Sequence, residues 1–197
     1  MKYRVLAIML SCFWLPLGSA KLVAGSPDQF EVSADTFTCI RDMSPVRGFY
    51  VDNLSGNLEG TLAAANAADG AEYPAGSVVQ LVPGEAMIKR APGFSPATRD
   101  WEFFELDTST SGTEIRNRGF ADVVNRFGGN CLACHAKAKP QWDMVCETGH
   151  GCDPIPLTRD LLVLLQKTDP RCDNNPALSP EEIVKLKALQ QSLQPQT

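Results

Sequence analysis

The sequence lacks the features that mark nucleic-acid-binding and membrane-spanning proteins. No block of lysine or arginine is present, and 18 basic against 23 acidic residues give a formal net charge of −5 at pH 7. Nucleic-acid binding needs a basic face and anionic membranes attract polybasic segments, so we expect neither partner. Beyond the N-terminal segment no apolar run approaches the roughly 18 residues that a membrane span requires.

Histidine is scarce as well, with only His135 and His150 in a chain of 197 residues. A metal site in this chain would therefore have at most two imidazoles to draw on. The rest of the composition, with 44% hydrophobic and 21% charged residues, is that of an ordinary globular protein. The length predicts one domain.

The first twenty residues have the pattern of a secretory signal peptide. Two basic residues precede an apolar stretch over 5–17, and small residues precede an expected cleavage after Ala20. Residues 21–197 are then a single exported domain, soluble in the periplasm or an equivalent compartment. Such compartments are oxidising, so cysteines that carry no other chemistry are expected to pair.

The mature chain combines strand-like and helical segments. The β-branched segment 77–82 predicts a strand, and 101–106 alternates apolar with acidic residues, which predicts a half-buried strand with Glu102 and Glu105 facing water. A Ser-Pro-Glu-Glu sequence at 179–182 is typical of a helix start. Further strands are predicted at 37–40, 48–51, 85–90 and 114–118, and helices at 58–68, 121–127 and 158–167. Thr158 is the expected N-cap of the last of these helices.

Residues 131–135 (CLACH) form the one motif with a specific chemistry. C-x-x-C-H is the attachment sequence of c-type haem. The thiols of Cys131 and Cys134 add across the two vinyl groups, and the imidazole of His135 becomes the proximal iron ligand. We therefore expect one covalently attached haem c, in a core of about residues 70–140.

Other interpretations of these cysteines remain open. A thioredoxin-like redox pair would need a βαβ context, which the pattern does not offer. A structural zinc site could use Cys131, Cys134, Cys146 and Cys152. Cysteines of ordinary disulfides beside a histidine are the third alternative. The last two would make the chain a secreted binding module held together by zinc or disulfides.

The late position of the motif bears on the sixth iron ligand. Small electron-transfer cytochromes place the motif near the N-terminus, with a methionine ligand far downstream. Here Met144 is the only later methionine, too close behind His135 to reach the opposite haem face easily. We expect an open or weakly capped iron that binds a small ligand. The alternative is a periplasmic electron carrier, served by a redox partner protein and capped by Met144 or by His150, which otherwise is expected to be an exposed loop residue.

Three segments resemble the cytochrome P-460 family, which includes the β-sheet-rich cytochromes c′. They are residues 73–79 (YPAGSVV), 100–104 (DWEFF) and 131–135. The resemblance implies an antiparallel, β-rich haem-binding domain, usually a homodimer, that binds NO or oxidises hydroxylamine. With the helix pattern added, the expected fold class is α+β with a few peripheral helices, two of them C-terminal.

Further candidates for the haem pocket come from side-chain chemistry and, for lysine, from the resemblance. Members with a haem crosslink carry a lysine just after the first of these strands, but residues 79–82 contain none and the next lysine is Lys89. This favours ligand binding over hydroxylamine oxidation. Because a guanidinium pairs well with carboxylates, arginines are candidates for the haem propionates. The candidates for the distal face or the propionates are Phe103, Phe104, Lys89, Arg41, Arg47 and Arg90.

Four further cysteines of the exported chain are expected to form two disulfides. They are Cys39, Cys146, Cys152 and Cys172. The sequence allows three pairings, of which we favour Cys146–Cys152 with Cys39–Cys172.

Overall fold

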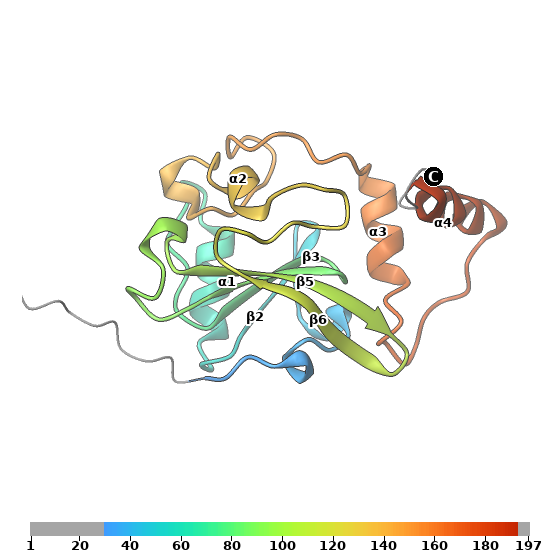
Figure 1. Cartoon of the computed structure of the whole chain (residues 1–197), viewed down its shortest axis with the longest axis horizontal. Helices are drawn as coiled ribbons and strands as arrows, with labels where there is room; N and C mark the ends of the chain where they lie inside the picture. The colour runs from blue at the N-terminus through green and yellow to red at the C-terminus, as the bar shows by residue number, and fades with distance from the viewer. Residues whose placement is uncertain (1–29, 193–197) are drawn as a thin grey trace, which may run out of the picture.

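A six-stranded antiparallel sheet forms the centre of the computed structural model, which describes residues 30–192 (Figure 1). Four α-helices accompany the sheet, and two of them are C-terminal. The predicted α+β fold class is therefore confirmed. The predicted signal peptide, residues 1–20, lies outside the described residues.

The strands lie in the sheet in the order in which they occur along the chain. They are β1 (Ser44–Val46), β2 (Phe49–Asn53), β3 (Ser77–Val82), β4 (Glu85–Lys89), β5 (Trp101–Ser109) and β6 (Gly112–Gly119). The helices are α1 (Leu58–Asn66), α2 (Cys131–His135), α3 (Arg159–Lys167) and α4 (Pro180–Ser192).

The sheet is covered on both faces, and β5 shows how its residues divide between them. Trp101 and Phe103 belong to a core cluster under α1, α2 and the segment that follows α2. Phe104 and Leu106 point to the other face, where they pack with Phe37 of the N-terminal segment. Figure 1 shows α2 on one side of the sheet and the N-terminal segment on the other.

Glu102 and Glu105 are buried, so the prediction that they face water is wrong. Their exposed fractions are 4% and 1%. Glu102 is ion-paired with Arg90 (2.8 Å) and Arg118 (2.7 Å), and Glu105 with Arg126 (2.9 Å). The alternation of residues identified a strand correctly, but both faces of that strand are covered, and arginines neutralise the buried carboxylates.

The two C-terminal helices begin where their capping residues predicted. The Thr158 hydroxyl accepts a hydrogen bond from the main-chain N–H of Leu161 (3.3 Å) at the start of α3. At the start of α4, the Ser179 hydroxyl accepts a hydrogen bond from the main-chain N–H of Glu182 (3.2 Å), and the Glu182 carboxylate accepts one from the main-chain N–H of Ser179 (2.8 Å). None of the helices within residues 30–192 is long and apolar enough to cross a membrane.

Two predicted elements are wrong. Residues 37–40 do not form a strand; they lead into a 3₁₀ turn (Ile40–Asp42) that is tied to the C-terminal part of the chain. Residues 121–127 do not form a helix, because the Asn125 side chain accepts hydrogen bonds from the N–H groups of Phe127 (3.1 Å) and Gly129 (2.8 Å) and closes a turn. Such local side-chain bonds compete with helix formation.

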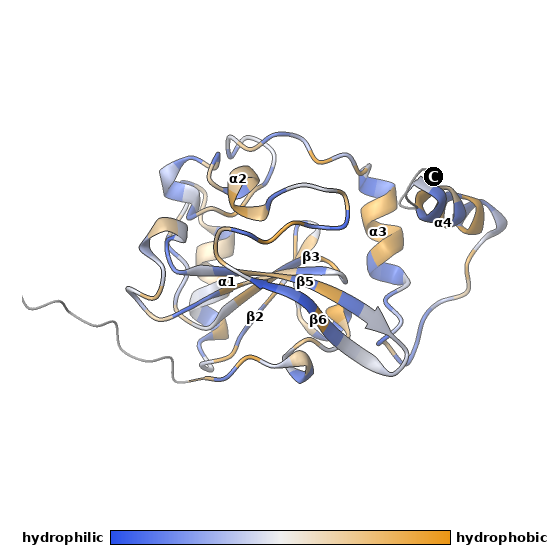
Figure 2. Ribbon diagram, in the orientation of Figure 1, coloured by the Kyte–Doolittle hydropathy of each residue, from blue (hydrophilic) through white to orange (hydrophobic). Residues whose placement is uncertain are grey.

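The sheet edges are polar or short. Figure 2 shows β6 coloured mainly as hydrophilic, and this edge strand carries Arg116, Asn117 and Arg118. At the other edge β1 has three residues, with Pro45 in the middle. Charged or proline-containing edges resist pairing with a further strand.

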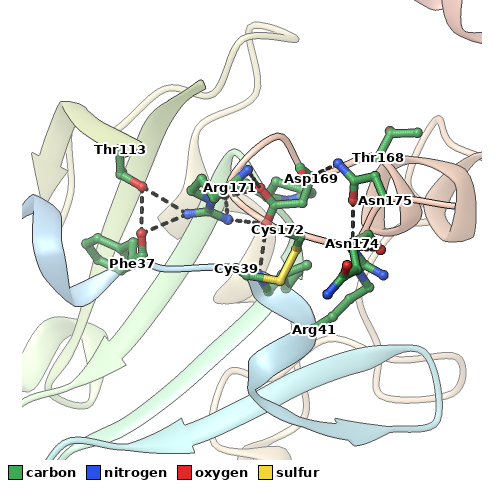
Figure 3. Close-up of a disulfide and its surroundings, with 12 residues drawn as sticks. Phe37, Cys39, Arg41, Thr113, Thr168, Asp169, Arg171, Cys172, Asn174 and Asn175 are labelled. Atoms are coloured by element: carbon green, nitrogen blue, oxygen red, sulfur yellow. Dashed lines mark hydrogen bonds and ion pairs between the residues drawn. A yellow bond between two sulfur atoms is a disulfide. The ribbon is translucent and has the colours of Figure 1, made fainter. Parts of the chain in front are cut away.

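A predicted disulfide joins the N-terminal segment to the chain after α3. Figure 3 shows the bond between Cys39 and Cys172 and the polar contacts around it. The main-chain N–H of Ile40 donates to Asp169 (2.9 Å), and Arg171 forms a buried ion pair with the same carboxylate (2.7 Å). This disulfide links the segment before the sheet to the connection between α3 and α4.

Candidate haem site

The side chain of Asn130 fixes the start of α2, the helix that carries the motif. The Asn130 side chain caps the helix by accepting a hydrogen bond from the N–H of Ala133 (2.8 Å), and it donates to the carbonyl of Ala121 (2.7 Å). Because residues three and four apart share a face of a helix, Cys131, Cys134 and His135 lie on one side of α2.

Cys131 and Cys134 are free thiols, each partly exposed. Burial raises the pKa of Cys131 to about 12, and the nearby carboxylates of Glu85 and Glu105 add to this effect. Burial also raises the pKa of Cys134. Redox-active C-x-x-C cysteines have lowered pKa values, so these thiols do not have the character of a thioredoxin-like pair.

The structure argues against the zinc alternative. Cys146 and Cys152 are bonded to each other, so two of the four thiols that this site required are not available. Within residues 30–192 no group of three or more histidine, cysteine or carboxylate side chains is arranged to hold a metal ion. Together with Cys39–Cys172, this bond confirms the favoured disulfide pairing.

The ring of His135 is oriented by the main chain. Its Nδ1 lies 2.7 Å from the carbonyl oxygen of Met144, and its ring centroid lies 5.2 Å from that of Phe103. A carbonyl oxygen only accepts, so Nδ1 carries the proton and Nε2 holds the lone pair. Burial lowers the pKa of His135, which favours this neutral form. No hydrogen bond within the described residues engages Nε2.

Met144 and His150 are both held by other contacts. Met144 is buried in the core cluster, while its carbonyl binds Nδ1 of His135. His150 is not the exposed loop residue that was expected. It is 8% exposed, stacks on Trp142 at 3.8 Å, and has its Nδ1 2.7 Å from the carbonyl oxygen of Val145. The segment containing both residues thus meets His135 on its Nδ1 side.

The structure brings only one of the two candidate phenylalanines to the motif. Phe103 packs against the imidazole of His135 on the α2 side of the sheet. Phe104 lies on the opposite face, 5.0 Å from Phe37 between ring centroids. Neighbouring residues of a strand point to opposite faces, which explains why adjacent phenylalanines have different surroundings.

The candidate arginines are all engaged elsewhere. Arg41 donates to Asn175 (2.7 Å) beside the Cys39–Cys172 disulfide. Arg47 binds Glu147 (2.6 Å) in the segment after α2, and Arg90 pairs with Glu102. Lys89, also a candidate, is 4% exposed and binds Asp143 (2.7 Å).

Sequence reasoning missed a pair of carboxylates next to Cys131. Glu85 and Glu105 are partners in the register of β4 and β5, and of these two carboxylates Arg126 forms an ion pair with Glu105 (2.9 Å). Burial and the charge of Glu105 raise the pKa of Glu85 to about 7. Residues twenty positions apart become neighbours only through strand register, so the linear sequence carried no signal for this pair.

Glu85→Gln is expected to stabilise the protein at alkaline pH. A carboxyl whose pKa is higher in the folded state than the ordinary 4.5 favours folding below pH 4.5, and this contribution is lost as the pH rises through 7. The wild-type protein should lose about 2 kcal/mol of unfolding free energy between pH 5 and pH 8 through this group. Urea titrations should show that Glu85→Gln removes this loss. Glu114→Gln, at an exposed strand position, is the control and should leave it unchanged.

Comparisons of the chain with family models, with curated proteins and with solved structures found no match. The C-x-x-C-H motif and the contacts around it are therefore the observations that bear on function.

Proposed function

We propose that this chain is an exported mono-haem c-type protein, similar to the cytochrome P-460 family, which binds small nitrogen-oxide ligands such as NO at an open iron. The observation that carries the proposal is the arrangement of His135. A metal-bound histidine normally donates its other ring N–H to a carboxylate or carbonyl. His135 has this bond at Nδ1, on a helix that presents two free thiols at the C-x-x-C spacing.

The residues present fit the attachment of a haem. Cys131 and Cys134 would hold it through thioethers, and His135 would bind the iron through Nε2. When bound, the haem supplies the redox-active iron, and the protein supplies binding, orientation and electrostatics. Phe103 packs on the imidazole and restricts its rotation. The two disulfides fit assembly in an oxidising compartment.

Two features support ligand binding over the other activities. Lys89 lies in an ion pair with Asp143, so the lysine nearest to the strand 77–82 is already engaged. This favours a haem without a lysine crosslink and hence NO binding over hydroxylamine oxidation. The Met144 carbonyl faces Nδ1 of His135, and His150 is engaged by Trp142 and by the Val145 carbonyl, which disfavours the six-coordinate electron carrier. A homodimer and a redox partner protein remain predictions.

The open iron can be tested by spectroscopy of the reduced holoprotein. Resonance Raman should show a five-coordinate, high-spin iron that binds CO or NO without displacing a protein ligand. His150→Ala and Met144→Leu should leave this spectrum unchanged. A six-coordinate, low-spin iron in the wild type that becomes five-coordinate in either variant would establish the electron-carrier alternative instead.

A further inference from the structure

The segment that accepts the hydrogen bond of His135 has an unusual backbone. Asp143 and Met144 are consecutive residues with φ angles of 46° and 66°, and neither is a glycine. Side chains disfavour this left-handed region, so such a conformation persists only where surrounding contacts enforce it. The carbonyl that faces Nδ1 of His135 belongs to the second of these residues.

Contacts from three other parts of the chain enforce this conformation at Asp143. Lys89, at the end of β4, binds both carboxylate oxygens of Asp143 (2.7 and 2.9 Å). The main-chain N–H of Tyr73 donates to the same carboxylate (2.9 Å), and the indole N–H of Trp101 donates to the Asp143 carbonyl (2.7 Å). Lys89, Trp101 and Asp143 are 4%, 0% and 2% exposed.

We propose that the buried Lys89–Asp143 pair, together with Trp101, positions the iron-binding histidine by holding the Met144 carbonyl against Nδ1 of His135. The inference rests on the proposed attachment of haem at this residue. Hydrogen bonds to the outer nitrogen of a ligating imidazole fix its orientation and raise its basicity toward the metal. Lys89 is thus a positioning residue on the proximal side of the site.

A role in geometry explains why the pair is ionic. A buried ion pair is often no more stabilising than well-packed apolar side chains of similar volume, because both charges lose their hydration. An ammonium bound to both carboxylate oxygens, however, allows that carboxylate very little freedom to rotate. The ion pair therefore restrains the left-handed backbone at Asp143 and Met144. In this way it also restrains the Met144 carbonyl, which His135 binds.

The test compares Lys89→Met and Trp101→Phe with the wild-type holoprotein. Trp101→Phe keeps an aromatic ring in the core and removes the N–H that binds Asp143, so it remains informative if Lys89→Met folds poorly. Arg171→Met is the matched control, because it breaks a buried ion pair with Asp169 beside the Cys39–Cys172 disulfide. A haem-stained denaturing gel confirms attachment, and resonance Raman and redox titration then report on the imidazole.

In both test variants the Met144 carbonyl is held less firmly against His135. The hydrogen bond to Nδ1 is then weaker, and the imidazole is a poorer electron donor to the iron. Both test variants should therefore keep the stained band, with a lower iron–histidine stretching frequency and a higher midpoint potential than the wild type. Arg171→Met should match the wild type in both measurements. An unchanged frequency and potential in Lys89→Met or, if that variant does not fold, in Trp101→Phe would overturn this inference alone. Absence of haem from the wild type would overturn the proposed function as well.

Discussion

Replacing Cys131 and Cys134 together by alanine should abolish covalent haem attachment. Each thiol forms one thioether, so a single replacement should reduce the amount of stable holoprotein, and the double replacement leaves no covalent bond. The measurement is a haem-stained denaturing gel of protein exported from cells that mature c-type cytochromes. The wild type should give a stained band, the single variants weaker bands, and the double variant none.

The control for this experiment is Cys146→Ala combined with Cys152→Ala. Like the double variant of the motif, it lacks two cysteines. These two lie after α2, however, and their sulfurs are bonded to each other. The control should therefore keep the stained band. An unstained wild-type band in maturation-competent cells would contradict the central proposal, and the two thiols of α2 would then need another explanation.

Of the two disulfides, Cys39–Cys172 should contribute more to stability, so its removal should cause the larger loss of unfolding free energy. The bond joins residues 133 positions apart, and Cys39 and Cys172 are both buried. A cross-link restricts the unfolded chain more as the loop it closes becomes longer. For a loop of this length we expect Cys39→Ala with Cys172→Ala to lower the free energy of unfolding by about 5 kcal/mol, as measured by urea titration.

The second disulfide supplies the comparison. Cys146 and Cys152 are only 6 positions apart, so their joint replacement by alanine should cost about 2 kcal/mol. Both variants replace two cysteines by alanine, which makes the difference between them a measure of loop length. Equal losses would show that the long-range bond does not contribute through the unfolded chain.

Local patterns in the sequence correctly predicted strands and helix ends, because these are decided by residues close together in the chain. The strand 77–82, the Thr158 cap of α3 and the Ser179 cap of α4 all lie where they were predicted. The side-chain periodicity of a strand and the capping of a helix are decided within a few residues, so the sequence displays them directly. The C-x-x-C-H motif is local in the same way.

Burial was harder to predict, because it depends on what covers an element. The alternation in 101–106 indicated a strand with one wet face, yet Glu102 and Glu105 are buried under arginines. The arginines that cover Glu102 contact the N-terminal segment, where Arg118 donates to the Val32 carbonyl (2.9 Å) and Arg90 lies over the ring of Phe30 (5.3 Å). Nothing in 101–106 itself indicates that this segment lies there. His150 shows the same effect, since its stacking on Trp142 arises from the fold of the loop.

The motif, the cysteines left to form disulfides and most of the strands and helices could be predicted from the sequence alone. The groups that surround the motif could not, because they are brought together by the folding of distant segments. The tertiary structure placed Phe103 beside His135 and Phe104 on the opposite face, and it brought Lys89 to Asp143, 54 positions further along the chain. Such contacts depend on strand register and on the path of long connections, which are set by the packing of the whole core and by no local sequence pattern.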